Sequence, residues 1–149
     1  MKYFTLKEME YSSTAVQKKM PNPIPRDQLL NWIWLIEKVL DPIREAYKKP
    51  IRVNSGFRTL QLNNAIGGSK TSQHMGLNNT AAADISGGSP GENKQIYNIA
   101  DRLQKEGKID FDQLIDENNM QWVHIGIKIK DPNRRQRLKI VNGKTVSIN

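Results

Sequence analysis

The stretch SQHMGLNNTAAADI, residues 72–85, joins a histidine in a Gly/Ser/Asn-rich segment to an aspartate that follows three alanines. His74 is one of only two histidines in a chain that has no cysteine. Polar loops of this kind often carry binding sites, because they are held at the surface by a rigid scaffold. We expect the alanines to form a buried strand that holds Asp84 in place. The stretch therefore predicts a loop followed by a strand, and raises the question of a metal site.

Length and charge limit the number of domains and the kinds of partner that the protein can have. At 149 residues the chain fits a single domain that can bury a core without disulfides or a structural metal. No apolar run approaches the roughly 20 residues that cross a bilayer, so we expect no membrane span. The formal net charge of +8 favours an anionic partner, namely nucleic acid, an acidic membrane surface or an acidic cell-wall polymer. Charge alone does not choose among these partners.

The order of hydrophobic patterns favours an α+β fold. Three prolines within MPNPIP indicate an extended segment, and an amphipathic helix is expected from Asp27, bent or split by Pro42. The later patterns predict a short strand, a second helix and two further strands, at residues 51–53, 92–107, 108–117 and 121–130. The short NNM segment between the last two strands favours a hairpin. Helices and strands are therefore mixed and do not alternate as βαβ units.

The C-terminal part of the chain, residues 133–149, is expected to form a basic hairpin. Its segment NRRQRLKI mixes basic and apolar residues and precedes Asn142 and Gly143, a pair favoured in type I′ turns. The hairpin would follow a core that carries the sequence motifs, at residues 25–130. Its basic side is either an ordinary solvated strand or a patch that binds polyanions.

The second histidine lies in a pattern that separates two strand faces. In QWVHIGIKIK, alternation places Trp122, His124 and Gly126 on one face and the most apolar residues on the other. Together with His74 and Asp84, this histidine completes a His, Asp, His set. Three such ligands with an open water position suit a catalytic zinc ion better than magnesium or calcium. A surface or satisfied core histidine remains the alternative on spacing alone.

Several separated motifs resemble those of the M15 peptidases, the D-Ala-D-Ala carboxypeptidase and L,D-endopeptidase group that acts on peptidoglycan peptides. The motifs are SQH, AADI and WVH, together with VNSGFRT, LNNAIGGSKTSQH and FDQLI. They follow one another in consistent order over residues 25–127. The resemblance implies one peptidase domain over residues 1–149 with the α+β Hedgehog/DD-peptidase fold, a small antiparallel sheet and flanking helices. It also implies one zinc ion per chain, held by His74, Asp84 and His124.

One departure from the family concerns the segment between the first two ligands. In the family the aspartate usually follows its histidine by seven residues, whereas Asp84 follows His74 by ten. Three residues therefore look inserted, in the loop at 76–79. A surface loop absorbs such a change at small entropic cost, and no other acidic residue lies between His74 and Glu92. A different ligand set, or a site distorted by the longer loop, is the alternative.

A second departure concerns the catalytic base. Many M15 enzymes carry an acidic residue three positions before the last histidine, but Gln121 stands there and cannot take a proton. In the branch that the chain most resembles, an acid follows the QLI strand instead, which points to Glu117, with Asp116 as its rival. Either carboxylate could reach a metal-bound water if the last two strands pair as a hairpin. Alternatively, both are surface groups near a turn.

Four further residues are assigned to the site. Arg58 is expected to stabilise the oxyanion or to clamp a substrate carboxylate, and otherwise is an ordinary surface arginine. Ser72 and Gln73 are expected to contact the substrate or the metal ligands and not to act as nucleophiles, because no histidine remains to activate a serine. Trp122, on the strand face of His124, joins this group.

These assignments lead to an expected function. The chain is expected to be a zinc metallopeptidase that hydrolyses amide bonds in peptidoglycan stem peptides, as a D-Ala-D-Ala carboxypeptidase or an L-Ala-D-Glu endopeptidase. Its expected partners are these peptides and anionic wall polymers, and the chain is expected to be a monomer.

The expected location follows from the N-terminal sequence. The segment MKYFTLKEMEYSSTA lacks the apolar stretch of a secretory signal, so we expect synthesis in the cytoplasm and release to the wall by another protein, as for a phage or prophage endolysin. The alternative is an inactive zinc-containing domain that binds wall peptides or polyanions. A nucleic-acid binder is disfavoured, because few aromatic residues look exposed.

Overall fold

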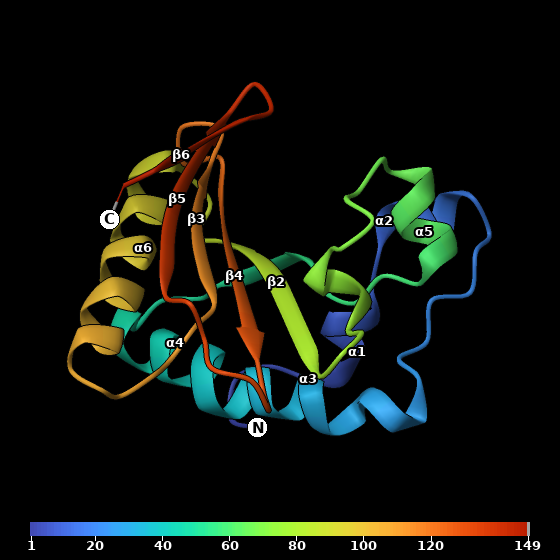
Figure 1. Ribbon diagram of the computed structural model, residues 1–149, viewed down its shortest axis with the longest axis horizontal. Helices are drawn as coiled ribbons and strands as arrows, with labels where there is room; N and C mark the ends of the chain where they lie inside the picture. The colour runs from blue at the N-terminus through green and yellow to red at the C-terminus, as the bar shows by residue number, and fades with distance from the viewer. Residues whose placement is uncertain (149) are drawn as a thin grey trace.

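A six-stranded sheet organises the protein, and the computed structural model of the chain describes residues 1–148 (Figure 1). The strands lie in the order β1-β2-β4-β3-β5-β6. Their bounds are β1 Arg52–Ser55, β2 Thr80–Ser86, β3 Gln113–Glu117, β4 Trp122–Lys128, β5 Gln136–Val141 and β6 Lys144–Ser147. Neighbouring strands pair antiparallel, except β3 and β5, which pair parallel. The expected α+β fold is therefore confirmed, although the parallel β3–β5 pair makes the sheet mixed where a small antiparallel sheet was expected.

The parallel pair arises where the chain leaves β4. Instead of forming a second hairpin with β4, the chain crosses to the far side of β3, and Gln113 of β3 lies opposite Gln136 of β5. A crossover of this kind depends on contacts between distant segments and leaves no local pattern. The C-terminal hairpin itself is confirmed. Strands β5 and β6 pair antiparallel around Asn142 and Gly143, whose φ values of 50° and 75° fit a type I′ turn.

The longer helices pack against one face of this sheet, whereas some of the short ones lie apart from it, beside β2 (Figure 1). The helical segments are α1 Leu6–Glu10, α2 Ser13–Gln17, η1 Arg26–Gln28, α3 Leu29–Leu35, η2 Ile36–Leu40, α4 Asp41–Tyr47, α5 Leu60–Ala65, η3 Gln73–Met75 and α6 Pro90–Lys105. Helix α6 packs on β2, β3 and β4, and α4 packs on α6. The short turn η3 contacts β2 and β4. None of these helices has the length and apolar character needed to cross a membrane.

Both helices expected from the sequence are present. The first is split near Pro42, as predicted, because η2 is a π turn that leads into α4, and Pro42 lies in the first turn of α4. Proline has no N–H to bond to the preceding turn, so a wider turn accommodates it. The second helix, α6, is followed by Gly107 with a φ of 73°.

The strand expected at 108–117 begins later, at Gln113. Residues 108–112 connect α6 to the sheet, and the side chain of Asp112 accepts hydrogen bonds there from Gln73 and Arg134. The strand expected at 121–130 is confirmed as β4, and Val123 and Ile125 are each 0% exposed. These apolar side chains belong to the main hydrophobic core. The alternate residues of β4 consequently point away from that core.

Candidate metal centre

Asp84 and His124 stand opposite each other on two paired strands. Strands β2 and β4 are antiparallel, and their register pairs Asp84 with His124. Partners in such a pair project to the same face, so both side chains point to the side opposite the apolar side chains of β4. Ala81, Ala82 and Ala83 are each 0% exposed, which confirms the buried strand expected before Asp84. The tightly packed strand fixes the position of the carboxylate.

His74 reaches the same place from the turn η3. The Oγ of Ser72 accepts a hydrogen bond from the His74 N–H at 3.2 Å, and the Arg58 N–H donates to the His74 carbonyl at 2.8 Å. The ring Nδ1 of His74 donates to the Gly56 carbonyl at 2.7 Å. A neutral imidazole that donates from Nδ1 keeps the lone pair of Nε2 free. His74 therefore presents Nε2 to the two strand residues.

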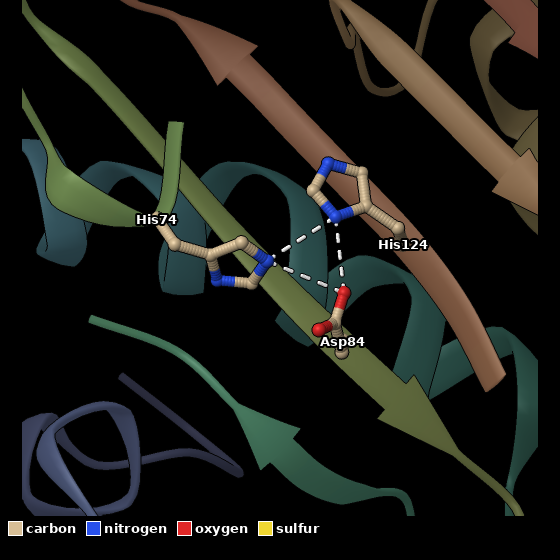
Figure 2. Close-up of side chains that lie close together, drawn as sticks. All are labelled: His74, Asp84 and His124. Atoms are coloured by element: carbon tan, nitrogen blue, oxygen red, sulfur yellow. Dashed lines mark hydrogen bonds and ion pairs between the residues drawn. The ribbon is translucent and has the colours of Figure 1, made fainter. Parts of the chain in front are cut away.

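Three potential ligand atoms converge at this point (Figure 2). The Oδ1 of Asp84 lies 3.0 Å from Nδ1 of His124 and 3.3 Å from Nε2 of His74. The two ring nitrogens lie 3.3 Å apart. All three residues are buried. The three residues therefore come together despite the longer loop, and they could hold one metal ion.

The charges in the cluster match those that metal binding requires. Burial alone would raise the pKa of Asp84, but the neighbouring His74 and His124 lower it far below its usual range. Burial lowers the pKa of His74, against the opposing attraction of Asp84. At neutral pH the site therefore offers a carboxylate and a neutral His74 imidazole. Metal ligands must be deprotonated in this way.

Arg58 lies beside the cluster and is mostly buried. Its Nη2 is 3.5 Å from Oδ2 of Asp84, and its Nε donates to the Ser55 Oγ at 3.1 Å. A third bond, of 3.4 Å, runs from Nη1 to the Asn63 Oδ1. Arg58 is thus not the ordinary surface residue of the alternative interpretation. It contacts the oxygen of Asp84 that faces away from the two histidines.

The register of the β3–β4 hairpin separates the two candidate bases. Ile115 pairs with His124 and Glu117 with Trp122, so Glu117 projects to the face of His124. Asp116 projects to the other face, and its Oδ1 accepts a bond from the Met120 N–H at 2.7 Å within the turn. Burial raises the pKa of Glu117. Of the two carboxylates, only Glu117 lines the cleft beside His124.

A cleft of about 660 Å³ opens beside His124. Ser72, Gln73 and Glu117 line it, and the Leu77–Asn78 part of the longer loop forms one wall. Three cationic side chains that the sequence analysis did not assign to the site also line it, those of Lys70, Lys128 and Arg134. Trp122 shares the strand face of His124 but is not among the lining residues.

Asp112 is a second feature that sequence reasoning missed. Its side chain is 0% exposed, and it accepts bonds from the Arg134 Nη2 at 2.7 Å and the Gln73 Nε2 at 2.9 Å. The signal was present as an aspartate within FDQLI and a basic cluster that begins at residue 134. The two segments could be joined only once the position of β5 beside β3 was known.

Comparison with known proteins agrees with this geometry. No curated protein matches the chain. The family model described as Peptidase M15 matches residues 2–126, a range that contains all three residues of the cluster. The match covers most of the chain and ends within β4, before the C-terminal hairpin. The chain therefore belongs to the M15 peptidase family.

Proposed function

We propose that the protein is a zinc-dependent peptidase that cleaves amide bonds in the stem peptides of peptidoglycan. The observation that carries the proposal is the convergence of His74, Asp84 and His124 next to a cleft that also contains Glu117. Membership of a peptidase family supports a peptide substrate.

The ligand set favours zinc. Two ligands at the usual zinc distances of about 2.0–2.2 Å, in tetrahedral geometry, lie about 3.4 Å from each other. The measured separations in the cluster are 3.0, 3.3 and 3.3 Å. Two imidazoles and one carboxylate also leave a fourth position for water, as in catalytic zinc sites. When bound, zinc would polarise the scissile carbonyl and lower the pKa of a bound water.

Glu117 is suited to the proton transfers of amide hydrolysis. It projects to the face of His124, and burial raises its pKa toward the range in which a carboxylate can both accept and release a proton. In the proposed reaction it accepts a proton from the attacking water and delivers it to the leaving amine. Arg58 holds Asp84 and adds positive charge near the reacting groups.

The charge of the cleft favours a substrate with carboxylates. The cations Lys70, Lys128 and Arg134 line the cleft, together with two acidic residues, Glu117 and Asp131. Stem peptides carry free carboxylates, which such cations bind by charge-assisted hydrogen bonds. The net charge of +8 would also hold the protein at a wall that contains anionic polymers. These features fit a D-Ala-D-Ala carboxypeptidase or an L-Ala-D-Glu endopeptidase.

Digestion of purified sacculi tests the proposal directly. Sacculi are incubated with the protein, with and without a chelator, and the released peptides are identified by mass spectrometry. We expect cleavage that the chelator abolishes and that added zinc restores. The masses identify the bond, and hence the choice between carboxypeptidase and endopeptidase. Absence of metal-dependent cleavage from every muropeptide would contradict the proposal.

Substitution of Glu117 separates an enzyme from an inactive zinc-containing binding domain. We expect Glu117→Gln to lower kcat by about 10²–10⁴-fold, the usual contribution of general acid–base catalysis, while zinc stays bound. Asp116→Asn is the matched control, because this neighbour points to the opposite face and bonds within the turn. A binding domain would hold zinc in all three proteins and release no peptide from any of them.

We extend the proposal to a role in wall lysis of the kind that phage and prophage endolysins perform. The positive charge of the protein supports attraction to the wall. Added from outside, the protein is expected to lyse cells whose wall has been made accessible. Cells that make it internally should survive until a second protein opens the membrane. Spontaneous export in the absence of such a partner would contradict this role.

A further inference from the structure

One buried polar atom next to the candidate metal centre lacks a partner. The side-chain oxygen Oε1 of Gln73 is shielded from solvent and has no hydrogen-bond partner among residues 1–148. A buried carbonyl without a donor costs about 1–3 kcal/mol of stability, so its presence calls for an explanation. Gln73 immediately precedes the ligand His74 and lines the cleft.

The direction of this oxygen is fixed by Asp112. The Nε2 of Gln73 donates to Oδ2 of Asp112 at 2.9 Å. An ionised carboxylate can only accept hydrogen bonds, so the amide nitrogen must face Asp112 and the amide oxygen must face away. Asp112 is in turn held by Arg134, whose Nε and Nη2 donate to it at 3.1 and 2.7 Å. The side-chain amide of Gln73 is therefore held in one orientation, with its oxygen pointing away from Asp112.

Gly126 provides the space into which this oxygen points. A Cβ atom on Gly126 would lie 2.0 Å from Oε1 of Gln73 and 3.3 Å from Nε2 of His124. Both atoms therefore border the volume that a side chain at position 126 would fill. The φ of Gly126 is not in the left-handed region, so its backbone does not require glycine. Glycine is needed at position 126 because any side chain there would collide with Oε1 of Gln73.

The Nε2 of His124 would be a suitable donor for this oxygen when the Nδ1 of His124 binds a metal. Its Nδ1 faces Asp84 and His74, at 3.0 and 3.3 Å, so Nε2 lies on the side of the ring toward Gly126. A neutral imidazole that binds through Nδ1 carries its proton on Nε2. Histidines that bind metals almost always donate this second proton to an oxygen, which fixes the orientation of the ring.

We propose that Gln73 is a positioning residue for His124: its Oε1 accepts the Nε2 proton of His124 and so fixes the tautomer in which Nδ1 binds the metal. Asp112 and Arg134 act through Gln73 by holding its amide. The inference rests on the metal site of the proposed function, but it does not depend on the substrate or on cleavage.

The test measures metal binding without any substrate. Zinc affinity is determined by competition with a chromogenic chelator for the wild-type protein, Gln73→Leu and Gly126→Ala. We expect both variants to bind zinc about 10–100-fold more weakly, the usual effect of removing the partner of a ligating histidine. In Gly126→Ala the new methyl group displaces Oε1. Gln113→Leu is the matched control, because Gln113 lines the same cleft and bonds to Gln136 instead.

A second measurement reads the tautomer itself. Long-range ¹H–¹⁵N NMR spectra of the zinc-loaded wild type should show His124 protonated at Nε2, with slow exchange of that proton with water. In Gln73→Leu the proton should exchange rapidly, whereas in Gln113→Leu it should stay protected. A structural role of Gln73 alone would lower thermal stability without changing this signal.

The outcomes are distinguishable. Wild-type zinc affinity in Gln73→Leu, with the Nε2 proton still protected, would overturn the inference and leave the proposed function intact. If Gln73→Leu fails to fold, Gly126→Ala decides, because it leaves the Gln73–Asp112 bond chemically possible. A wild-type protein that binds no zinc would overturn both the proposed function and this inference.

Discussion

The carboxylate of Glu117 is half-buried, on the same face of the sheet as His124. Burial raises its pKa, and Asp84 and Asp116 act in the same direction, whereas His124 and Arg58 oppose them. In the metal-free protein the Glu117 carboxyl group is therefore expected to titrate above the ordinary range of glutamate. Detection of its side-chain carboxyl carbon by NMR over a pH series measures this, and titration at or below the ordinary range would contradict the burial effect.

The same shift predicts how stability depends on pH. A carboxyl group whose pKa is raised in the folded protein stabilises it below the pKa of the unfolded chain, and this contribution is lost as pH rises through the folded pKa. In the metal-free protein, Glu117→Gln should therefore be more stable than the wild type at neutral pH, and the difference should vanish in acid. Urea unfolding at several pH values measures it. A loss of stability at neutral pH would contradict the assigned burial effect.

The residues of the site differ in how far the sequence revealed them. His74, Asp84 and His124 were identified from motifs, and the structure brings them together. The sequence favours Glu117 over Asp116 only through the family resemblance, because strand alternation identifies neighbours that share a face but does not show which face meets the metal. The pairing of Ile115 with His124 shows that Glu117, and not Asp116, lies on the same face of the sheet as His124.

At the scale of elements, the pair Asp112–Arg134 joins the segment before β3 to the segment before β5. Burial would raise the pKa of Asp112, but hydrogen bonds from Arg134 and Gln73 lower it. We expect Arg134→Met to reduce the free energy of unfolding by about 1–3 kcal/mol, because it removes donors from a buried carboxylate. Part of the loss is offset by Lys128, whose Nζ lies 3.7 Å from Asp112.

The pH dependence of this loss has a definite sign. A carboxylate with a lowered pKa stabilises the folded protein above the pKa of the unfolded chain, and this contribution is lost as pH falls through the folded pKa. Arg134→Met should therefore cost most at neutral pH and least in acid. Arg135→Met is the control, since Arg135 pairs with Asp110 at the exposed surface. Equal losses for the two variants would contradict the role of the buried pair.

Local elements could be predicted, whereas their long-range pairing could not. The split at Pro42, the helix α6 and the turn at Asn142 and Gly143 each depend on residues close in sequence. The parallel pairing of β3 and β5 depends on contacts between segments more than twenty residues apart, including the bond from the Gln136 N–H to the Asp112 carbonyl at 2.9 Å. No periodicity in either segment encodes that contact.

At the scale of the whole molecule, metal binding should couple to stability. The three ligands come from η3, β2 and β4, so a bound ion joins elements that separate on unfolding. At a free zinc concentration 100-fold above Kd, the folded protein gains about 2.7 kcal/mol. We expect a chelator to lower Tm, and zinc but not magnesium to restore it in calorimetry. His124→Ala should abolish the response, and a response that survives this change would place the metal elsewhere.

The C-terminal hairpin bears on the choice of fragments for engineering. The family match ends at residue 126, and a fragment cut there would retain every candidate metal ligand together with Glu117. It would nevertheless remove Lys128 and Arg134, and with them the two cations that neutralise the fully buried Asp112. We therefore expect the smallest stably folded fragment to extend beyond the segment that matches the family. Added domains are better joined beyond β6, an exposed outer strand separated from the metal-binding strands by β5 and β3.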